Sequence, residues 1–141
     1  MTRSCRLTFE VPGEPRGQGR PRFNRHTGAA YKDSESKAYE AKIVAYYRKT
    51  FGNFRWPDDA IIAVDVTAVY AIPKSASKAT AAAMASGDLM PTRKPDIDNV
   101  LKAVLDALNG VAYKDDARVV AVSAKKVYGE PKLVIEIKGS V

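Results

Sequence analysis

The first strand that the sequence predicts covers residues 5–11, where apolar and polar side chains alternate at every position. Alternation with a period of two is typical of a strand that buries one face against a core. The apolar face consists of Cys5, Leu7, Phe9 and Val11. Because Cys5 is the only cysteine in the chain, it cannot form an internal disulfide, and we expect a small buried strand residue.

Three further strands are predicted by segments rich in isoleucine and valine, at residues 60–71, 118–128 and 132–138. The last two are separated by three turn-forming positions, Gly129, Glu130 and Pro131. This short turn between two strand-like segments predicts an antiparallel hairpin.

Helices are predicted where apolar residues recur every three or four positions. The pattern is strongest over residues 96–109, whose apolar face consists of Ile97, Val100, Leu101, Val104, Leu105 and Leu108. A second helix runs from an Asp33 or Ser34 cap to Phe51, and its apolar stripe consists of Tyr39, Ile43, Tyr46, Tyr47 and Thr50. The alanine-rich residues 75–87 predict a short, lightly packed helix. The resulting order predicts an α+β fold, with a small mixed or antiparallel sheet covered by helices.

The length of 141 residues suits one domain, which we take as residues 1–141. No apolar run approaches the roughly 20 residues that span a bilayer. Residues 1–10 lack the apolar core of a signal peptide, so we expect a cytoplasmic protein with no membrane partner. The chain has 23 Lys and Arg against 16 Asp and Glu, a formal net charge of +7. This excess favours a polyanionic partner such as nucleic acid.

The basic residues gather in a predicted loop at residues 13–31, called the arginine loop below, and in a connector at residues 91–95. Gly17, Gly19 and Pro21 interrupt the arginines of the loop, so its backbone can lie close to a DNA strand while the side chains reach successive phosphates. We expect the loop to clamp DNA outside the catalytic group of residues. The candidate DNA-binding residues are Arg16, Arg20, Arg22, Arg25, Arg93 and Lys94.

Acidic residues stand at both ends of the strongest predicted helix. Asp96 and Asp98 are two positions apart in extended backbone, so their side chains project to the same side. One of them can cap the helix, but a cap needs a single aspartate. Lys102 lies four positions after Asp98, which makes either an ordinary surface pair worth ~0.3–0.5 kcal/mol or an ammonium group beside metal-binding carboxylates. Asp115 and Asp116 follow the helix in a turn, where adjacent acids are often only solvated turn formers.

A hard divalent cation accounts for these acids as a group. Clustered carboxylates repel one another, and they weaken the attraction for phosphate unless a proton or a metal neutralises them. Mg²⁺ prefers oxygen ligands and binds one or two carboxylates together with substrate phosphate. It would polarise a scissile phosphate and supply hydroxide for in-line attack. The acids and the basic loop together favour Mg²⁺-dependent hydrolysis of a phosphodiester, with Mn²⁺ as a substitute.

The segment from Arg93 to Asn109, followed by Tyr113-Lys114-Asp115-Asp116, closely resembles the RusA family of Holliday junction resolvases. The family pattern is Asp-x-Asp-Asn, a lysine four residues after the second aspartate, and an Asp-Asp pair beyond the helix. Every part is present at matching spacing. The arginine loop and the closing strands are also similar, so the resemblance covers nearly the whole chain.

The resemblance implies a RusA-like fold and a role for each acid. It implies metal ligands and catalytic residues at Asp96, Asp98 and Asp116, with Asp115 as an auxiliary ligand or a turn former. It gives Lys102 the stabilisation of charge on the scissile phosphate or the leaving oxygen. It also implies a two-fold homodimer that cuts two strands of a four-way DNA junction symmetrically, in recombination and repair.

Two other functions fit parts of the sequence. A non-catalytic nucleic-acid-binding protein explains the basic loop but leaves the aspartates as caps and turn formers. A metal-dependent phosphohydrolase acting on nucleotides explains the acids but not the basic loop, so no small-molecule substrate is expected. His26, alone in the arginine loop, is expected to contact phosphate or solvent rather than act as a general base.

Overall fold

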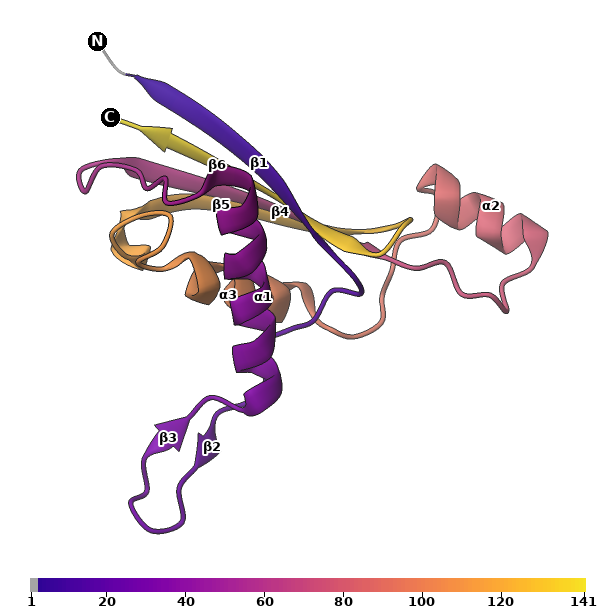
Figure 1. Ribbon diagram of the computed structural model, residues 1–141. Helices are drawn as coiled ribbons and strands as arrows, with labels where there is room; N and C mark the ends of the chain where they lie inside the picture. The colour runs from indigo at the N-terminus through magenta and orange to yellow at the C-terminus, as the bar shows by residue number, and fades with distance from the viewer. Residues whose placement is uncertain (1–2) are drawn as a thin grey trace.

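The computed structural model describes residues 3–141, which form a four-stranded mixed sheet with the strand order β1-β6-β4-β5. Strand β6 pairs antiparallel with both β1 and β4, whereas β4 and β5 are parallel. Helices α1 and α3 lie on one side of this sheet (Figure 1). The α+β prediction is therefore confirmed, and the sheet is mixed. The bounds are β1 (Ser4–Pro12), α1 (Ser34–Phe51), β4 (Ile61–Tyr70), α2 (Lys78–Ser86), α3 (Ile97–Leu108), β5 (Val119–Tyr128) and β6 (Lys132–Ser140).

Strands β5 and β6 do not form the predicted hairpin, because β4 lies between them. The connection 129–131 crosses the end of β4, where the Gly129 N–H donates to the Tyr70 carbonyl at 2.9 Å. A Cβ at Gly129 would stand 3.0 Å from Val69 Cγ1, so the crossing is tight. Turn residues predict that the chain reverses. They do not indicate that a third strand, the apolar β4, lies between β5 and β6 in the sheet.

Helix α1 begins and ends where the sequence predicts. Asp33 Oδ1 accepts a hydrogen bond from the Ser36 N–H at 3.2 Å, and Gly52 at the other end has a φ of +63° that favours glycine. Thr50 is exposed, and its hydroxyl donates to the Tyr46 carbonyl instead of packing in the core. The helix otherwise buries the predicted stripe through Tyr39, Ile43 and Tyr47.

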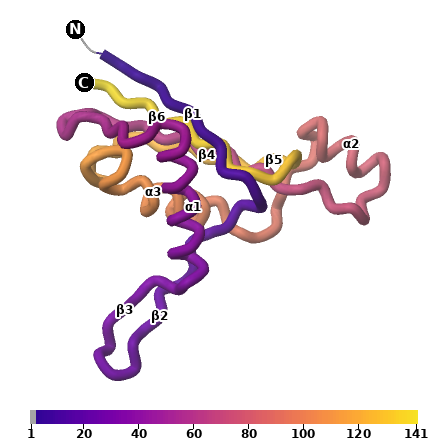
Figure 2. The backbone as a smooth tube through the Cα atoms, viewed as in Figure 1, coloured from indigo at the N-terminus to yellow at the C-terminus, as the bar shows by residue number. Residues whose placement is uncertain are grey.

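The core lies between the sheet and the α1–α3 layer. Helix α1 contacts β1 and α3, whereas α3 contacts β4 and β5. The tube in Figure 2 shows both helices beneath the strands. Buried aliphatic side chains of β4 and β6 meet the apolar face of α3 here, and the largest of them are Ile62, Val64, Val66, Leu133, Ile135, Ile137, Val100, Val104 and Leu108.

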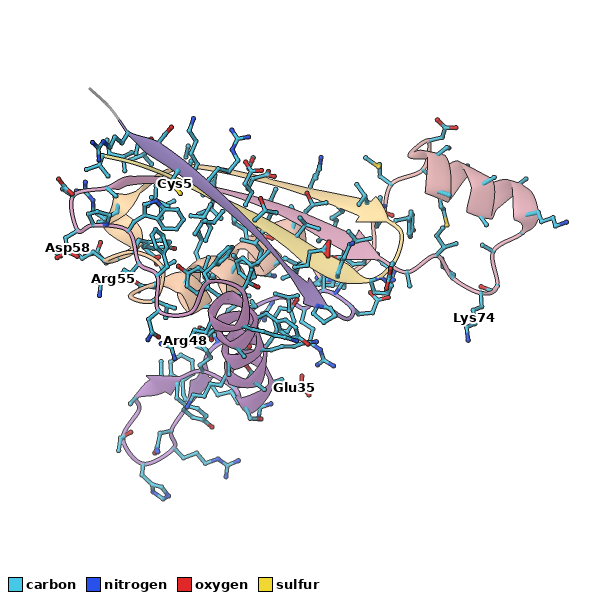
Figure 3. The ribbon with its side chains drawn as sticks, turned by 45° about the horizontal axis from the view of Figure 1, so that its top comes forward. Cys5, Glu35, Arg48, Arg55, Asp58 and Lys74 are labelled. Carbon is cyan, nitrogen blue, oxygen red and sulfur yellow. The ribbon has the colours of Figure 1, made fainter. Side chains whose placement is uncertain are left out.

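Cys5 is exposed, so the prediction of a buried cysteine is wrong. It lies towards the N-terminal end of β1, an edge strand (Figure 3). The predicted face is correct, since Leu7 is half-buried while Phe9 and Val11 are buried. Burial increases along β1 because only its second half passes over α1, which makes T-shaped aromatic contacts with Phe9 through Tyr47 and Phe51.

Two segments project from the body in Figure 1. Helix α2 buries no residue, as its alanine-rich sequence predicts. The arginine loop, predicted without regular structure, contains a short antiparallel ladder between β2 (Arg22–Phe23) and β3 (Ala30–Tyr31), which forms a projecting hairpin. Within the described residues, no helix is long and apolar enough to cross a membrane.

Candidate active site

Asp96 occupies the N-cap position of α3, but its side chain makes no capping hydrogen bond. Its backbone carbonyl accepts from the N–H groups of Asn99 and Val100, each at 3.1 Å. The carboxylate is half-exposed and pairs with Lys94, whose Nζ lies 3.4 Å from Oδ2. Helix capping therefore does not account for the carboxylate of Asp96, which is available to a ligand.

Helix α3 carries Asp98, Lys102 and Asp106 at successive turns on its polar side. Asp98 and Lys102 are exposed, and neither forms an ion pair within residues 3–141. At 1.5 Å of rise per residue, Asp98 and Asp106 are separated by about 12 Å along the helix, with Lys102 midway. The backbone of Lys102 thus lies midway along the helix between those of Asp98 and Asp106.

The arginine loop packs directly on the beginning of α3. A Cβ at Gly17 would stand 2.9 Å from Asn99 Cβ and 3.0 Å from Pro95 Cβ, so only glycine allows this approach without displacement. The next residue, Gln18, donates from its backbone N–H to the Asn99 carbonyl at 2.9 Å. The Gly19 N–H donates to Ser36 Oγ at 2.9 Å, which joins the loop to α1 as well.

Two hollows bring predicted DNA-binding residues to the predicted catalytic residues. Arg16, Lys94 and Asp96 line one hollow of about 360 Å³. Arg20 and Lys102 line a second hollow of about 240 Å³ on the other side of the loop. The sequence predicts that the loop lies outside the catalytic group. Instead, the loop lines two hollows together with the predicted catalytic residues Asp96 and Lys102.

The remaining predicted basic residues differ in their surroundings. Arg93 packs its guanidinium 5.0 Å from the centre of the Tyr70 ring and lies 3.5 Å from Glu14 Oε1, so part of its charge is already balanced. Arg22 lies near Asp33, whose pKa is lowered below its usual value mainly by the hydrogen bond with Ser36 and further by the charge of Arg22. Arg25 is exposed in the hairpin turn beside His26, which is likewise exposed.

The two acids beyond α3 have different environments. Asp115 caps a short 3₁₀ helix, η1 (Asp116–Arg118), because its Oδ1 accepts from the Ala117 N–H at 2.8 Å. Asp116 has a pKa raised above its usual value by burial and by the charges of Asp106 and Asp115. A carboxylate surrounded by negative charge gains most from a bound cation. Asp115 therefore forms the turn, and Asp116 stays a predicted ligand.

The family to which the chain belongs follows from comparison with known proteins. A family model described as endodeoxyribonuclease RusA matches residues 12–138. The chain belongs to the RusA family. It is also 36% identical over 143 residues to the uncharacterized protein YqaN of Bacillus subtilis (strain 168), covering 94% of this chain and 95% of that protein. RusA membership supports a nuclease and implies Holliday junction resolvase activity on branched DNA.

The oxygen donors of this RusA chain suit a hard divalent cation, the kind of metal on which the family generally depends. They divide into two groups, with Asp96 and Asp98 at the start of α3 and Asp115 and Asp116 beyond its end. Within residues 3–141, no three His, Cys, Asp or Glu side chains lie close enough to hold one ion between them. Each group alone supplies the one or two carboxylates that Mg²⁺ takes when phosphate and water complete its shell.

Several polar residues of the RusA site did not emerge from the sequence. Asp106 lies on the polar side of α3, but its sequence position alone predicts no role. Gln18 of the arginine loop and Lys32, which directly follows that loop, bind the Asp106 carboxylate, and Glu40 of α1 holds Lys32. Tyr113 donates to Asp116 Oδ1 at 3.4 Å. The contacts of Asp106 and Lys32 depend on the course of the loop, which no periodicity in the sequence indicates.

Proposed function

We propose that this RusA-family chain is a Mg²⁺-dependent endonuclease that resolves four-way DNA junctions by paired, symmetric phosphodiester hydrolysis, with Mn²⁺ able to replace Mg²⁺. The observation that carries the proposal is the seating of the arginine loop on α3. It puts Arg16 in one hollow with Asp96 and Arg20 in another with Lys102. A phosphate drawn in by these arginines would arrive beside carboxylates that can hold a cation.

The residues would divide the reaction between them. Asp96, Asp98 and Asp116 are the proposed ligands. With phosphate and water completing its shell, a divalent cation bound by these carboxylates at either end of α3 would polarise the scissile phosphate and favour attack by water. Lys102 would stabilise the negative charge that develops on the phosphate or on the leaving oxygen. Arg16, Arg20, Arg22 and Arg25, with Arg93 and Lys94, would bind the flanking phosphates and fix the strand in line.

A two-fold homodimer supplies the second cut. One chain carries one set of the proposed catalytic residues and would nick one strand. A domain of 141 residues has a radius of gyration of about 14 Å, so it spans on the order of one helical turn of duplex. Two symmetric cuts in a junction therefore call for two chains related by a two-fold axis.

The proposal is tested with a synthetic four-way junction and a linear duplex of the same sequence, each with and without Mg²⁺. We expect paired nicks in the junction alone, and only with Mg²⁺. Asp96→Asn and Asp98→Asn should abolish cleavage while keeping or slightly increasing junction affinity, because each removes a ligand and also a repulsive charge. Junction binding by the wild type without cleavage under any divalent cation would instead identify a non-catalytic DNA-binding protein.

A further inference from the structure

The two ends of the β2–β3 hairpin are bound by the same carboxylate oxygen. Asp106 Oδ2 accepts from Gln18 Nε2 at 2.9 Å and lies 3.4 Å from Lys32 Nζ. Gln18 precedes β2, whereas Lys32 directly follows β3. In the sequence, the whole hairpin therefore lies between Gln18 and Lys32, and the side chains of both residues contact Asp106 of α3.

Lys32 is itself held from a second direction. Its Nζ lies 2.6 Å from Glu40 Oε2 of α1, so the ammonium group bridges α1 and α3. The side chains of Lys32, Glu40 and Asp106 are 31%, 15% and 27% exposed, respectively. Solvent and salt screen such partly buried pairs less than pairs at a fully exposed surface. The bridge thus ties the residue that follows β3 to both α1 and α3.

The position of Asp106 relates this anchor to the candidate active site. Asp106 lies one helical turn beyond Lys102, and both line the same hollow of about 220 Å³ with Gln18, Pro21 and Tyr31. A change at Asp106 would move the base of the hairpin relative to Lys102. The arginines of the hairpin would move with that base, although none of them touches Asp106.

We infer that Asp106 is a positioning residue, which fixes the base of the β2–β3 hairpin on α3 and so sets where the hairpin arginines stand relative to Lys102. It acts through Gln18 and Lys32 and needs no contact with DNA or metal. The role of the arginines in DNA binding rests on the proposed function, but the anchoring of the hairpin does not.

The anchor is tested without DNA by amide hydrogen exchange. The Gln18 and Gly19 amides, bonded to Asn99 and Ser36, report whether the loop is docked. Asp106→Ala should speed their exchange about tenfold, because the carboxylate that binds both side chains is removed and the loop opens locally. Asp106→Asn should give a smaller increase, since its carbonyl still accepts from Gln18.

Amides outside the anchor provide the internal controls. The Asn24 N–H bonds within the hairpin turn to the Ala29 carbonyl at 2.8 Å, and its exchange should not change if the hairpin moves as a unit. The matched variant is Asp65→Ala, which removes one charge from β4, where Asp65 accepts from Ser123 and contacts no loop residue. Unchanged exchange at Gln18 and Gly19 in Asp106→Ala would overturn the inference. If Asp106→Ala does not fold, Gln18→Ala and Lys32→Met carry the same test from the two ends of the hairpin.

A second arm measures the junction. At saturating DNA, Asp106→Ala should cleave about tenfold more slowly, whereas the slope of log affinity against log salt should be unchanged because every phosphate-binding cation is kept. Asp65→Ala should match the wild type in both measurements. Faster loop exchange in a chain whose wild type cuts no junction would leave the anchor standing and reject the nuclease. Normal cleavage and unchanged loop exchange in Asp106→Ala would reject the anchor and leave the nuclease standing.

Discussion

The Tyr113 hydroxyl donates to Asp116 Oδ1 at 3.4 Å, and this bond favours the ionised carboxylate. Burial and the charges of Asp106 and Asp115 act in the opposite direction and dominate, so the pKa of Asp116 is raised above its usual 3.8. The folded state then binds this proton more tightly than the unfolded chain does. The stability that this proton provides is complete below the unfolded pKa and is lost as pH rises through the folded pKa.

Asp116→Asn should therefore raise the thermal midpoint at pH 7 in the absence of divalent cations. The advantage should shrink as pH falls and vanish near pH 3, where the wild-type carboxyl is also neutral. Thermal melts across this pH range in a chelating buffer provide the measurement. Tyr113→Phe removes the bond that favours ionisation and should raise the pKa of Asp116 further, as followed by NMR titration. A stabilisation by Asp116→Asn that is the same at pH 3 and pH 7 would contradict this account.

Asp115 and Asp116 form a matched pair for testing the ligand assignment. Asp116→Asn should abolish junction cleavage, because it removes a proposed ligand charge. Asp115→Asn should keep most of the activity, because an asparagine carbonyl can still accept from the Ala117 N–H and cap η1. Cleavage rates at saturating DNA and Mg²⁺ provide the comparison. If the result is reversed, with Asp116→Asn active and Asp115→Asn inactive, Asp115 is the ligand.

Lys102→Ala should slow cleavage at saturating DNA by about 10²-fold, the scale of losing one preorganised charge partner in a transition state. Lys102→Arg should restore only part of the rate, because a planar guanidinium does not replace a compact ammonium group. Lys78→Ala removes an equal charge from the exposed helix α2 and is the control. A Lys102→Ala variant that binds DNA more weakly but turns over normally would make Lys102 a DNA-positioning contact.

The arginine loop is tested through the salt dependence of DNA binding. Neutralising Arg16, Arg20 and Arg22 together should flatten the slope of log affinity against log salt by roughly 0.9 for each phosphate that the variant no longer neutralises. A triple variant at Arg6, Arg48 and Arg55 removes the same charge from β1, from the end of α1 and from the α1–β4 connection. It should leave the slope nearly unchanged. Equal effects of the two variants would mean that net charge, rather than the loop, sets the salt dependence.

The sequence predicted the fold where local rules decide it. Spacing and residue type predict the caps of α1 at Asp33 and Gly52, the apolar face of α3 and the light packing of α2. The structure confirms all three. The prediction of a hairpin at residues 129–131 was wrong, because the strand that pairs with both β5 and β6 is β4, about sixty residues earlier in the chain. The burial of Cys5 failed for a similar reason, since a periodicity identifies the face of a strand but not how far along it the neighbouring helix reaches.

For the candidate site too, the sequence predicts the features set by local spacing but not those set by tertiary contacts. Lys102 lies on α3 as its spacing predicts. The prediction that Asp96 and Asp98 share an extended backbone is wrong, because Asp96 is the extended N-cap residue whereas Asp98 already lies in the first turn of the helix. Their roles in catalysis stay predictions. The seating of Gly17 on Asn99 and the meeting of Gln18 and Lys32 on Asp106 could not be predicted. They depend on the course of a loop that has no periodicity and is fixed only by tertiary contacts.

The position of β6 bears on the order in which the molecule can assemble. Among the described strands β6 is the last to leave the ribosome, yet it is a central strand, flanked by β1 on one side and β4 on the other. Strand β1, the first to be synthesised, has no partner in the sheet until that moment. Pairings so distant in sequence are slow to form. The sheet against which α3 packs can therefore be completed only after residues 132–140 have been synthesised, and β1 waits for a partner from the opposite end of the described chain.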